Sequence, residues 1–145
     1  MSYFPKSQTD KWGTPPDLYQ ALDAEFHFDG IDPCPMSWTE GADADGLLIE
    51  WTGSRIFVNP PYTNVKAWAA KCHTEFLKGK LIVLLTNNYT DSPWFHEYVY
   101  GKHEVRFIKG RVKFVRVDGS VGLSNPRGSM LSIFNGNGPE ANESD

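Results

Sequence analysis

The sequence has few features of membrane, secreted or metal-binding proteins. None of its apolar runs approaches the roughly 20 residues that a membrane-spanning helix needs. The polar segment from residue 1 to residue 11 has no apolar core of the kind found in signal peptides. The two cysteines, Cys34 and Cys72, have no metal-ligand spacing and form no disulfide framework. We therefore expect a cytoplasmic protein that uses no metal and does not enter a membrane.

The chain also lacks a strong overall charge, since its net charge is −4. The average conceals an uneven distribution, because residues 102–127 hold seven basic and two acidic side chains, a local charge of +5. A basic third on an acidic protein is typical of a surface that contacts phosphate. A merely solvated face explains the same pattern, so charge alone leaves both interpretations open.

Length and composition predict one folded domain. With 145 residues, 40% of them hydrophobic and 14% aromatic, the chain can bury a substantial core. We expect a flexible arm over residues 1–11 and a single domain over residues 12–134. Residues 135–145 are acidic and without periodicity, which predicts a disordered tail.

The most informative stretch is Arg55-Ile56-Phe57-Val58-Asn59-Pro60-Pro61-Tyr62. Its apolar run predicts a strand buried on both faces, and Pro60 must end that strand because proline has no N–H for the sheet. Asn59 and Tyr62 are then held at the carboxyl end of the strand, where open α/β sheets bind ligands. Asn-Pro-Pro is also a good turn, and a simple strand end is the alternative.

The flanking sequence predicts an α/β fold with a mixed sheet of about five to six strands and about three helices. A helix after Tyr62 that ends at Gly79, followed by an apolar strand over residues 80–86, makes a βαβ unit with the first strand. Thr14 is expected to cap another helix whose first residue is Pro15, and a short helix is expected from Pro93. Further strands are expected over residues 28–32, 105–108, 111–117 and 130–134.

Several motifs in a fixed order resemble the small phage-type DNA N-6-adenine methyltransferase (Dam) family. They are Trp12-Gly13-Thr14-Pro15, Ile31-Asp32-Pro33-Cys34, Asp45-Gly46-Leu47, Asn59-Pro60-Pro61-Tyr62, Asp91-Ser92-Pro93-Trp94-Phe95 and Gly110-Arg111-Val112-Lys113-Phe114. The resemblance runs from about residue 11 to residue 134. It implies a compact Rossmann-like methyltransferase fold, S-adenosylmethionine as methyl donor and adenine in double-stranded DNA as acceptor. A phage-encoded enzyme of this kind would work in the host cytoplasm.

The resemblance also implies roles for particular residues. The catalytic residues are Asn59, Pro60, Pro61 and Tyr62. The residues implied to bind the cofactor are Trp12, Thr14, Pro15, Asp32, Pro33, Cys34, Asp45 and Leu47, although Asp32 and Asp45 could instead cap turns. The residues expected to contact DNA are Lys109, Arg111, Lys113, Arg116, Asn125 and Arg127, with a structural ion pair as the alternative for Arg111.

The chemistry of the motif fits transfer to an amino group. The side-chain oxygen of Asn59 and the main-chain oxygen of Pro60 can accept the two hydrogens of an adenine amino group and localise the nitrogen lone pair, while Tyr62 can stack on the ring. Pro33-Cys34-Pro35 stands where many methyltransferases have a glycine-rich loop, so the cofactor region is reduced and a homodimer could complete the sheet edge. Two alternatives remain: a methyltransferase for protein glutamine amides, and an inactive binding module of the same fold.

Overall fold

The structure is a computed structural model that describes residues 12–43, 45–116, 118–122 and 127–140. Its helices are α2 (Pro16–Phe26), α3 (Val65–Leu77) and α4 (Pro93–Tyr98), with the one-turn 3₁₀ helix η1 (Tyr62–Asn64) before α3. Its strands are β1 (Arg55–Val58), β2 (Leu81–Asn87), β3 (Glu104–Phe107) and β4 (Ser129–Phe134). No helix in these described ranges is long and apolar enough to cross a membrane. The predicted arm over residues 1–11 lies outside the described residues.

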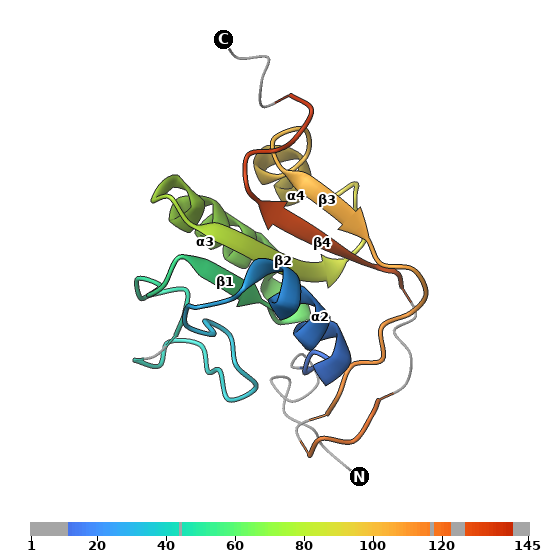
Figure 1. Ribbon diagram of the computed structural model, residues 1–145. Coiled ribbons are helices and arrows are strands. Elements are labelled where there is room, and N and C mark those ends of the chain that lie inside the picture. The colour runs from blue at the N-terminus through green and yellow to red at the C-terminus, as the bar shows by residue number, and fades with distance from the viewer. Residues whose placement is uncertain (1–11, 44, 117, 123–126, 141–145) are drawn as a thin grey trace.

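The four strands form one mixed sheet in the order β1-β2-β4-β3 (Figure 1). β1 and β2 are parallel and joined through α3, which confirms the predicted βαβ unit. β4 is antiparallel to both β2 and β3. β1, β2 and β3 therefore run in one direction, and β4 is the reversed strand between the last two. This arrangement leaves β3 as an outer strand of the sheet.

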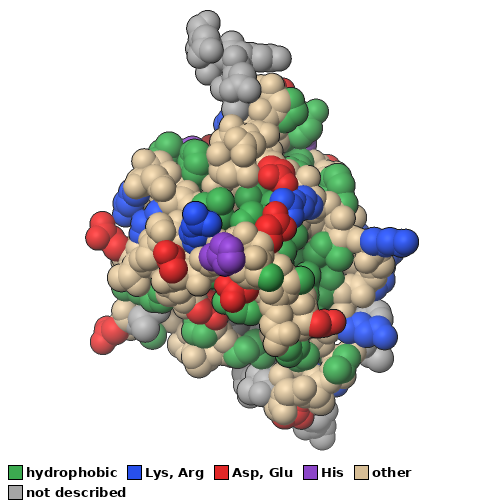
Figure 2. All heavy atoms as spheres, in the orientation of Figure 1, with side chains coloured by type: hydrophobic (Ala, Val, Ile, Leu, Met, Phe, Trp, Pro, Cys, Tyr) green, Lys and Arg blue, Asp and Glu red, His purple; other side chains and the backbone are tan. Residues whose placement is uncertain are grey.

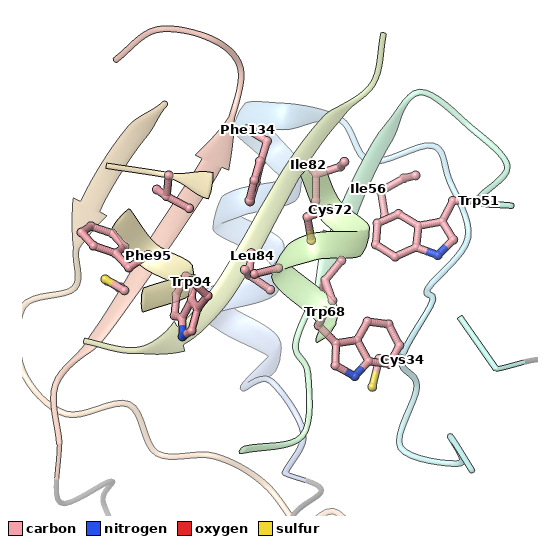
Figure 3. Close-up of a cluster of buried hydrophobic side chains, with 14 residues drawn as sticks. Cys34, Trp51, Ile56, Trp68, Cys72, Ile82, Leu84, Trp94, Phe95 and Phe134 are labelled. Atoms are coloured by element: carbon pink, nitrogen blue, oxygen red, sulfur yellow. The ribbon is translucent and has the colours of Figure 1, made fainter. Parts of the chain in front are cut away.

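Helices cover both faces of the sheet because alternate strand residues point to opposite sides. On one face, α3 and α4 pack over Ile56, Ile82 and Leu84 around the buried Trp68 (Figure 3). Cys72 belongs to this cluster and is a fully buried core residue. On the other face, α2 packs Leu22 and Phe26 against a second cluster. The strand residues of that cluster are Phe57, Val83, Leu85, Leu131 and Ile133.

The prediction of five to six strands was wrong for the described residues, because two expected strands do not form. Residues 28–32 lie beside the start of β1 without a regular ladder. The main-chain N–H groups of Asp29 and Gly30 both donate to the Arg55 carbonyl, and that of Ile31 donates to the Thr52 carbonyl. Between residues 111 and 116, only Val115 makes isolated bridges, to Gly13 and Val121. The buried–exposed alternation of that segment comes from packing on the α2 face, not from a strand.

The predicted start of the first helix was also wrong by one residue. α2 begins at Pro16, Pro15 is its N-cap, and no side chain caps it. The Thr14 hydroxyl is instead hydrogen-bonded to the Asn59 side chain. Threonine favours N-cap positions, which is why a cap was predicted at Thr14. In the structure its hydroxyl makes a tertiary contact instead.

A buried carboxylate links α3 to the segments around β1 and β2. Glu75 is fully buried, and Lys71, Lys78 and Lys80 surround it at 2.9–3.1 Å. Burial alone would raise the pKa of Glu75, but these three ion pairs lower it to about 2. Lys80 also donates to the Trp51 carbonyl. The ion pairs thus attach the end of α3 to the loop that leads into β1.

The folded region continues past the predicted boundary at residue 134. Gly138 donates its main-chain N–H to the Lys102 carbonyl, and Glu140 donates to the Gly101 carbonyl. Gly136 donates to Nδ1 of the buried His103. Residues 135–140 therefore pack against the turn before β3, and residues 141–145 lie outside the described part of the chain.

Candidate active site

The Asn59-Pro60-Pro61-Tyr62 loop lies at the carboxyl end of β1, as predicted. The side chain of Asn59 has a defined orientation, because its Nδ2 donates to the Trp12 carbonyl at 2.7 Å and to Thr14 Oγ1 at 3.1 Å. A carbonyl oxygen can only accept, so the atom that faces Trp12 must be the nitrogen of the amide. Asn59 Oδ1 accepts no hydrogen bond from any described residue. The two contacts therefore use the amide nitrogen and leave Asn59 Oδ1 as an acceptor that a ligand could reach.

The two prolines hold the loop rigidly. Both are buried, and Pro61 has an extended conformation with φ −65° and ψ 146°. The Pro60 carbonyl accepts no main-chain hydrogen bond from the described residues. A second oxygen acceptor is thus available directly after Asn59, on a backbone whose φ angles the two rings restrict.

Tyr62 lines a cavity of about 180 Å³. The cavity is also lined by Thr86, Tyr89 and Trp94, which lie on and after β2. The Tyr62 ring meets Phe114 edge to face, with centroids 6.2 Å apart. Burial raises the pKa of Tyr62 to about 12, so its hydroxyl stays protonated throughout the physiological range.

A second cavity, of about 320 Å³, is lined by Asn59 and by segments that are distant from one another in sequence. Of the residues predicted to bind the cofactor, Trp12, Thr14, Asp32 and Cys34 line it together with Asn59. Sequence reasoning missed Gly13, Pro16, Tyr19, Met36, Phe57 and Val115, which also line it. Of these, Phe57 lies on the strand that was predicted to end at the site, but the predicted burial of both faces of that strand did not single it out.

Gly13 explains how the amino-terminal segment reaches this cavity. Its N–H and carbonyl exchange hydrogen bonds of 2.8 and 2.9 Å with the main chain of Val115. A Cβ atom on Gly13 would stand 2.6 Å from the Val115 side chain. The absence of a side chain therefore lets Trp12 and Thr14 come close enough to hold Asn59.

Four of the residues predicted to bind the cofactor do not line this cavity, namely Pro15, Pro33, Asp45 and Leu47. The Asp45 carboxylate is nearly fully buried and accepts hydrogen bonds from Trp38 Nε1, Gly41 N and Leu47 N at 2.8–2.9 Å. This arrangement matches the turn-forming alternative for Asp45. Asp32 Oδ1 likewise accepts from Cys34 N at 3.1 Å, although Asp32 also faces the cavity.

The loop that carries Asp45 packs against Pro33, the residue before Cys34, which lines the cavity. A Cβ atom on Gly46 would stand 2.1 Å from the Pro33 carbonyl oxygen, so only glycine permits this approach. The indole of Trp51 donates to the Gly46 carbonyl at 2.7 Å. The loop is thereby fixed against the backbone of Pro33 and Cys34.

Several basic side chains predicted to contact DNA are exposed, and two of them lie against residues that line the cavities. Lys109, Arg111, Lys113, Arg116 and Arg127 are all exposed, whereas Asn125 lies outside the described residues. Basic side chains project at the edge of the molecule where the segment after β3 runs (Figure 2). Arg116 lies 5.8 Å from the Trp12 ring, and Arg127 lies 4.7 Å from the Tyr89 ring. Arg111 forms no ion pair with a described carboxylate, so its guanidinium remains available.

The described residues contain no group of three or more His, Cys, Asp or Glu side chains able to hold a metal ion.

Comparison with known proteins indicates the family of this chain. A model of the DNA N-6-adenine-methyltransferase (Dam) family matches residues 1–141. A DNA N-6-adenine-methyltransferase of Haemophilus phage HP1 (strain HP1c1) is 26% identical over 145 residues, which cover 92% of this chain and 83% of the phage protein.

Proposed function

The chain belongs to the DNA N-6-adenine-methyltransferase (Dam) family, and we propose that it transfers a methyl group from S-adenosylmethionine to the N-6 amino group of adenine at particular sites in double-stranded DNA. One observation carries the mechanism: Trp12 and Thr14 orient the Asn59 amide so that its oxygen is the group left to accept a hydrogen bond. The proposed chemistry requires no metal.

The 320 Å³ cavity fits the cofactor in volume and lining. Ligand sites are mostly apolar hollows of about 300–1,000 Å³ with a few polar groups. Here the rings of Trp12, Tyr19 and Phe57 offer apolar contact, and the Asp32 carboxylate offers a partner for a cation. When bound, S-adenosylmethionine supplies an electrophilic methyl group. Asp45 and Leu47 would support this site through the Pro33–Cys34 backbone.

Catalysis by the chain's own residues is mainly positioning. The adenine amino group is a weak nucleophile because its lone pair is delocalised into the ring. Asn59 Oδ1 and the Pro60 carbonyl each accept one of its hydrogens, which favours a pyramidal nitrogen with a localised lone pair. The rigid loop supplies these acceptors without reorganisation during the reaction.

We place the ring of the target base beside Tyr62, at the 180 Å³ cavity, with its amino group turned toward Asn59 and Pro60. A base must leave the duplex to reach it, at a cost of a few kcal/mol that stacking on Tyr62 and Tyr89 partly offsets. The exposed cations from Lys109 to Arg127 bind phosphates and position the duplex. Arg127 reads base edges, a role also proposed for Asn125, which lies outside the described residues. The host cytoplasm, where DNA is accessible, is the proposed location if the protein is phage-encoded.

The sheet is consistent with a reduced Rossmann-like fold in a single domain. Its strands β1, β2 and β3 share one direction, and the proposed sites lie at the carboxyl end of β1. That position is where open α/β sheets bind ligands. The loops at residues 28–47 take the place of additional strands beside β1.

A labelling experiment tests the proposed activity. The protein is incubated with unmethylated duplex DNA and S-adenosylmethionine labelled in its methyl group, and the DNA is digested to nucleosides. Label in N-6-methyladenine, lost in Asn59→Ala, supports the proposal. DNA that stays unlabelled at every salt concentration tested would reject it, and label in protein glutamine would favour the amide methyltransferase instead.

A further inference from the structure

A hollow larger than either cavity of the proposed active site lies elsewhere in the described part of the chain. It has a volume of about 720 Å³ and lies along β3, and it shares no lining residue with the cavity at Asn59 or with the cavity at Tyr62. One wall is made by the rings of Phe95, His96 and Tyr100, whose centroids are 5.3–6.1 Å apart. Its charged lining residues are Glu104 and Glu140, with no Lys or Arg. An acidic, aromatic surface of this kind disfavours nucleic acid and favours protein.

The hollow borders an open strand edge. β3 is the outermost strand of the sheet in Figure 1. The main-chain N–H groups of Glu104 and Ile108 point toward the β4 side, where they donate to Asn135 Oδ1 and to the Ser129 carbonyl. Because N–H and C=O groups alternate along a strand, those of Val105 and Phe107 face outward. Soluble proteins normally protect such an edge, and an exposed apolar one pairs readily with another strand.

Two large apolar side chains beside this edge are exposed to solvent. The Phe107 side chain is 66% exposed and that of Tyr100 is 56% exposed. The charged side chains of the strand do not shield the edge, because Arg106 folds back onto Glu25 of α2 at 2.6–2.7 Å and also contacts Glu104. The edge therefore combines unpaired main-chain groups with apolar surface.

We propose that this edge binds a second copy of the chain, through antiparallel pairing of the two β3 strands about a two-fold axis at Val105. This register places Glu104 of each copy opposite Arg106 of the other, so no like charges face each other across the strand pair. It also places Phe107 of each copy opposite His103 of the other, and His103 lines the 720 Å³ hollow. Each exposed ring thus enters the hollow of the second copy.

Because the β3 edge is complementary to itself, it favours a second copy of the chain as the partner and an axis at Val105 as the register. Moving the axis by one residue to Arg106 would set two guanidinium groups directly opposite each other, which destabilises a strand pair. A two-fold interface requires one surface patch that is complementary to itself. In this register Glu104 faces Arg106, and Phe107 faces the hollow at His103, from each copy to the other. β1 lies at the other side of the sheet order, so this pairing leaves the Asn59 loop accessible.

Sedimentation measurements across a range of protein concentrations test the dimer. We expect the wild type to dimerise and Phe107→Asp to weaken dimerisation at least about tenfold, because it puts a charge into the aromatic hollow. Leu77→Asp is the matched control, since Leu77 on α3 is 69% exposed and distant from β3 in sequence, and it should dimerise normally. Methyl transfer per protomer should stay unchanged in Phe107→Asp, which separates this proposal from the proposed activity.

A cysteine crosslink tests the register. At a two-fold axis on Val105, the two Val105 Cα atoms would be about 5.5 Å apart, within the range that a disulfide spans. Val105→Cys should therefore give a covalent dimer on mild oxidation, and Leu77→Cys should not. The native Cys34 and Cys72 are buried and should not interfere. A monomeric wild type would overturn the proposal, as would a dimer that persists in Phe107→Asp or that Val105→Cys fails to crosslink.

Discussion

Asn59 Nδ2 lies 3.1 Å from Thr14 Oγ1 and 2.7 Å from the Trp12 carbonyl, across 45 and 47 residues of sequence. The contact joins the segment before α2 to the end of β1. Without it, the Asn59 amide could rotate and present its nitrogen to an amino group, and two donors would then face each other. The orientation of one side chain thus links the fold of the amino-terminal segment to the proposed chemistry.

Replacing the Thr14 hydroxyl should lower the rate of methyl transfer. Thr14→Val keeps the shape of the side chain but removes the group that holds Asn59 Nδ2, and we expect kcat to fall about tenfold, which corresponds to about 1.4 kcal/mol. Thr14→Ser keeps the hydroxyl and should stay within about threefold of the wild type. Steady-state kinetics with both substrates measures this. Equal losses in the two variants would contradict an orienting role for the hydroxyl.

Tyr62 should act through its ring and not through its hydroxyl. Because burial raises the pKa of Tyr62 to about 12, the phenol does not ionise over the working range, so Tyr62→Phe should leave the pH profile of kcat unchanged. Tyr62→Ala should weaken binding of the extruded base by about 1–3 kcal/mol. Fluorescence of 2-aminopurine at the target position would report the extrusion. A shifted pH profile in Tyr62→Phe would show that the hydroxyl takes part.

The buried carboxylate of Glu75 should contribute to stability at neutral pH. Glu75→Gln leaves three lysines without their shared partner, and we expect the free energy of unfolding to fall by about 3 kcal/mol. Glu50→Gln is the matched control, since the side chain of Glu50 is 87% exposed and its ion pair with Lys78 should contribute at most about 1 kcal/mol. Urea denaturation measures both variants, and equal effects would contradict the importance of burial.

The same group predicts a dependence of stability on pH. The pKa of Glu75 is lowered from 4.5 to about 2 in the folded state, so its contribution is fully present above the unfolded value and is lost as the pH falls from about 4.5 to about 2. Glu75→Gln should flatten the loss of stability in this acidic window. An unchanged acid profile in the variant would mean that other carboxylates cause the loss.

The basic surface should bind DNA through phosphates. Arg111→Ala and Lys113→Ala should each weaken binding and reduce the slope of log K against log salt by about 0.9 for each phosphate that the variant no longer binds. Lys102→Ala is the control, because Lys102 belongs to the basic third of the sequence but lies on the turn before β3. Fluorescence anisotropy at several salt concentrations distinguishes these outcomes. An equal effect of all three variants would mean that charge alone, and not placement, governs binding.

Local patterns were sufficient to predict the centre of the fold. The apolar strands on either side of α3, and the prolines that end β1, depend on neighbouring residues and were predicted correctly. The segment at residues 111–116 was not, since an irregular chain that packs Val112 and Phe114 onto a core has the same alternation as a strand. Periodicity reports which side chains are buried but not whether the backbone is paired.

The site was predictable where a motif is contiguous and less so where it is assembled from distant segments. Asn59 to Tyr62 lie in one loop, so their placement follows from the strand end. The role of Thr14 depends on Gly13 approaching Val115, a contact that no local pattern contains. Asp45 has the residue type of a cofactor ligand, but its oxygens are occupied by its own loop. Which hydrogen bonds a polar side chain makes is decided only by the tertiary structure.

A double-mutant cycle on the single-turnover rate of adenine methylation in duplex DNA tests whether Asn59 is catalytic and whether Thr14 acts through it. Asn59→Ala should cost at least about 100-fold, comparable to the loss of a main electrostatic contact in other enzymes. If Thr14 acts through Asn59, the double variant Thr14→Val with Asn59→Ala should be no slower than Asn59→Ala alone. Multiplicative losses would contradict an orienting role for Thr14, because Thr14 and Asn59 would then act independently. A wild-type rate in Asn59→Ala would contradict the catalytic role of Asn59 itself.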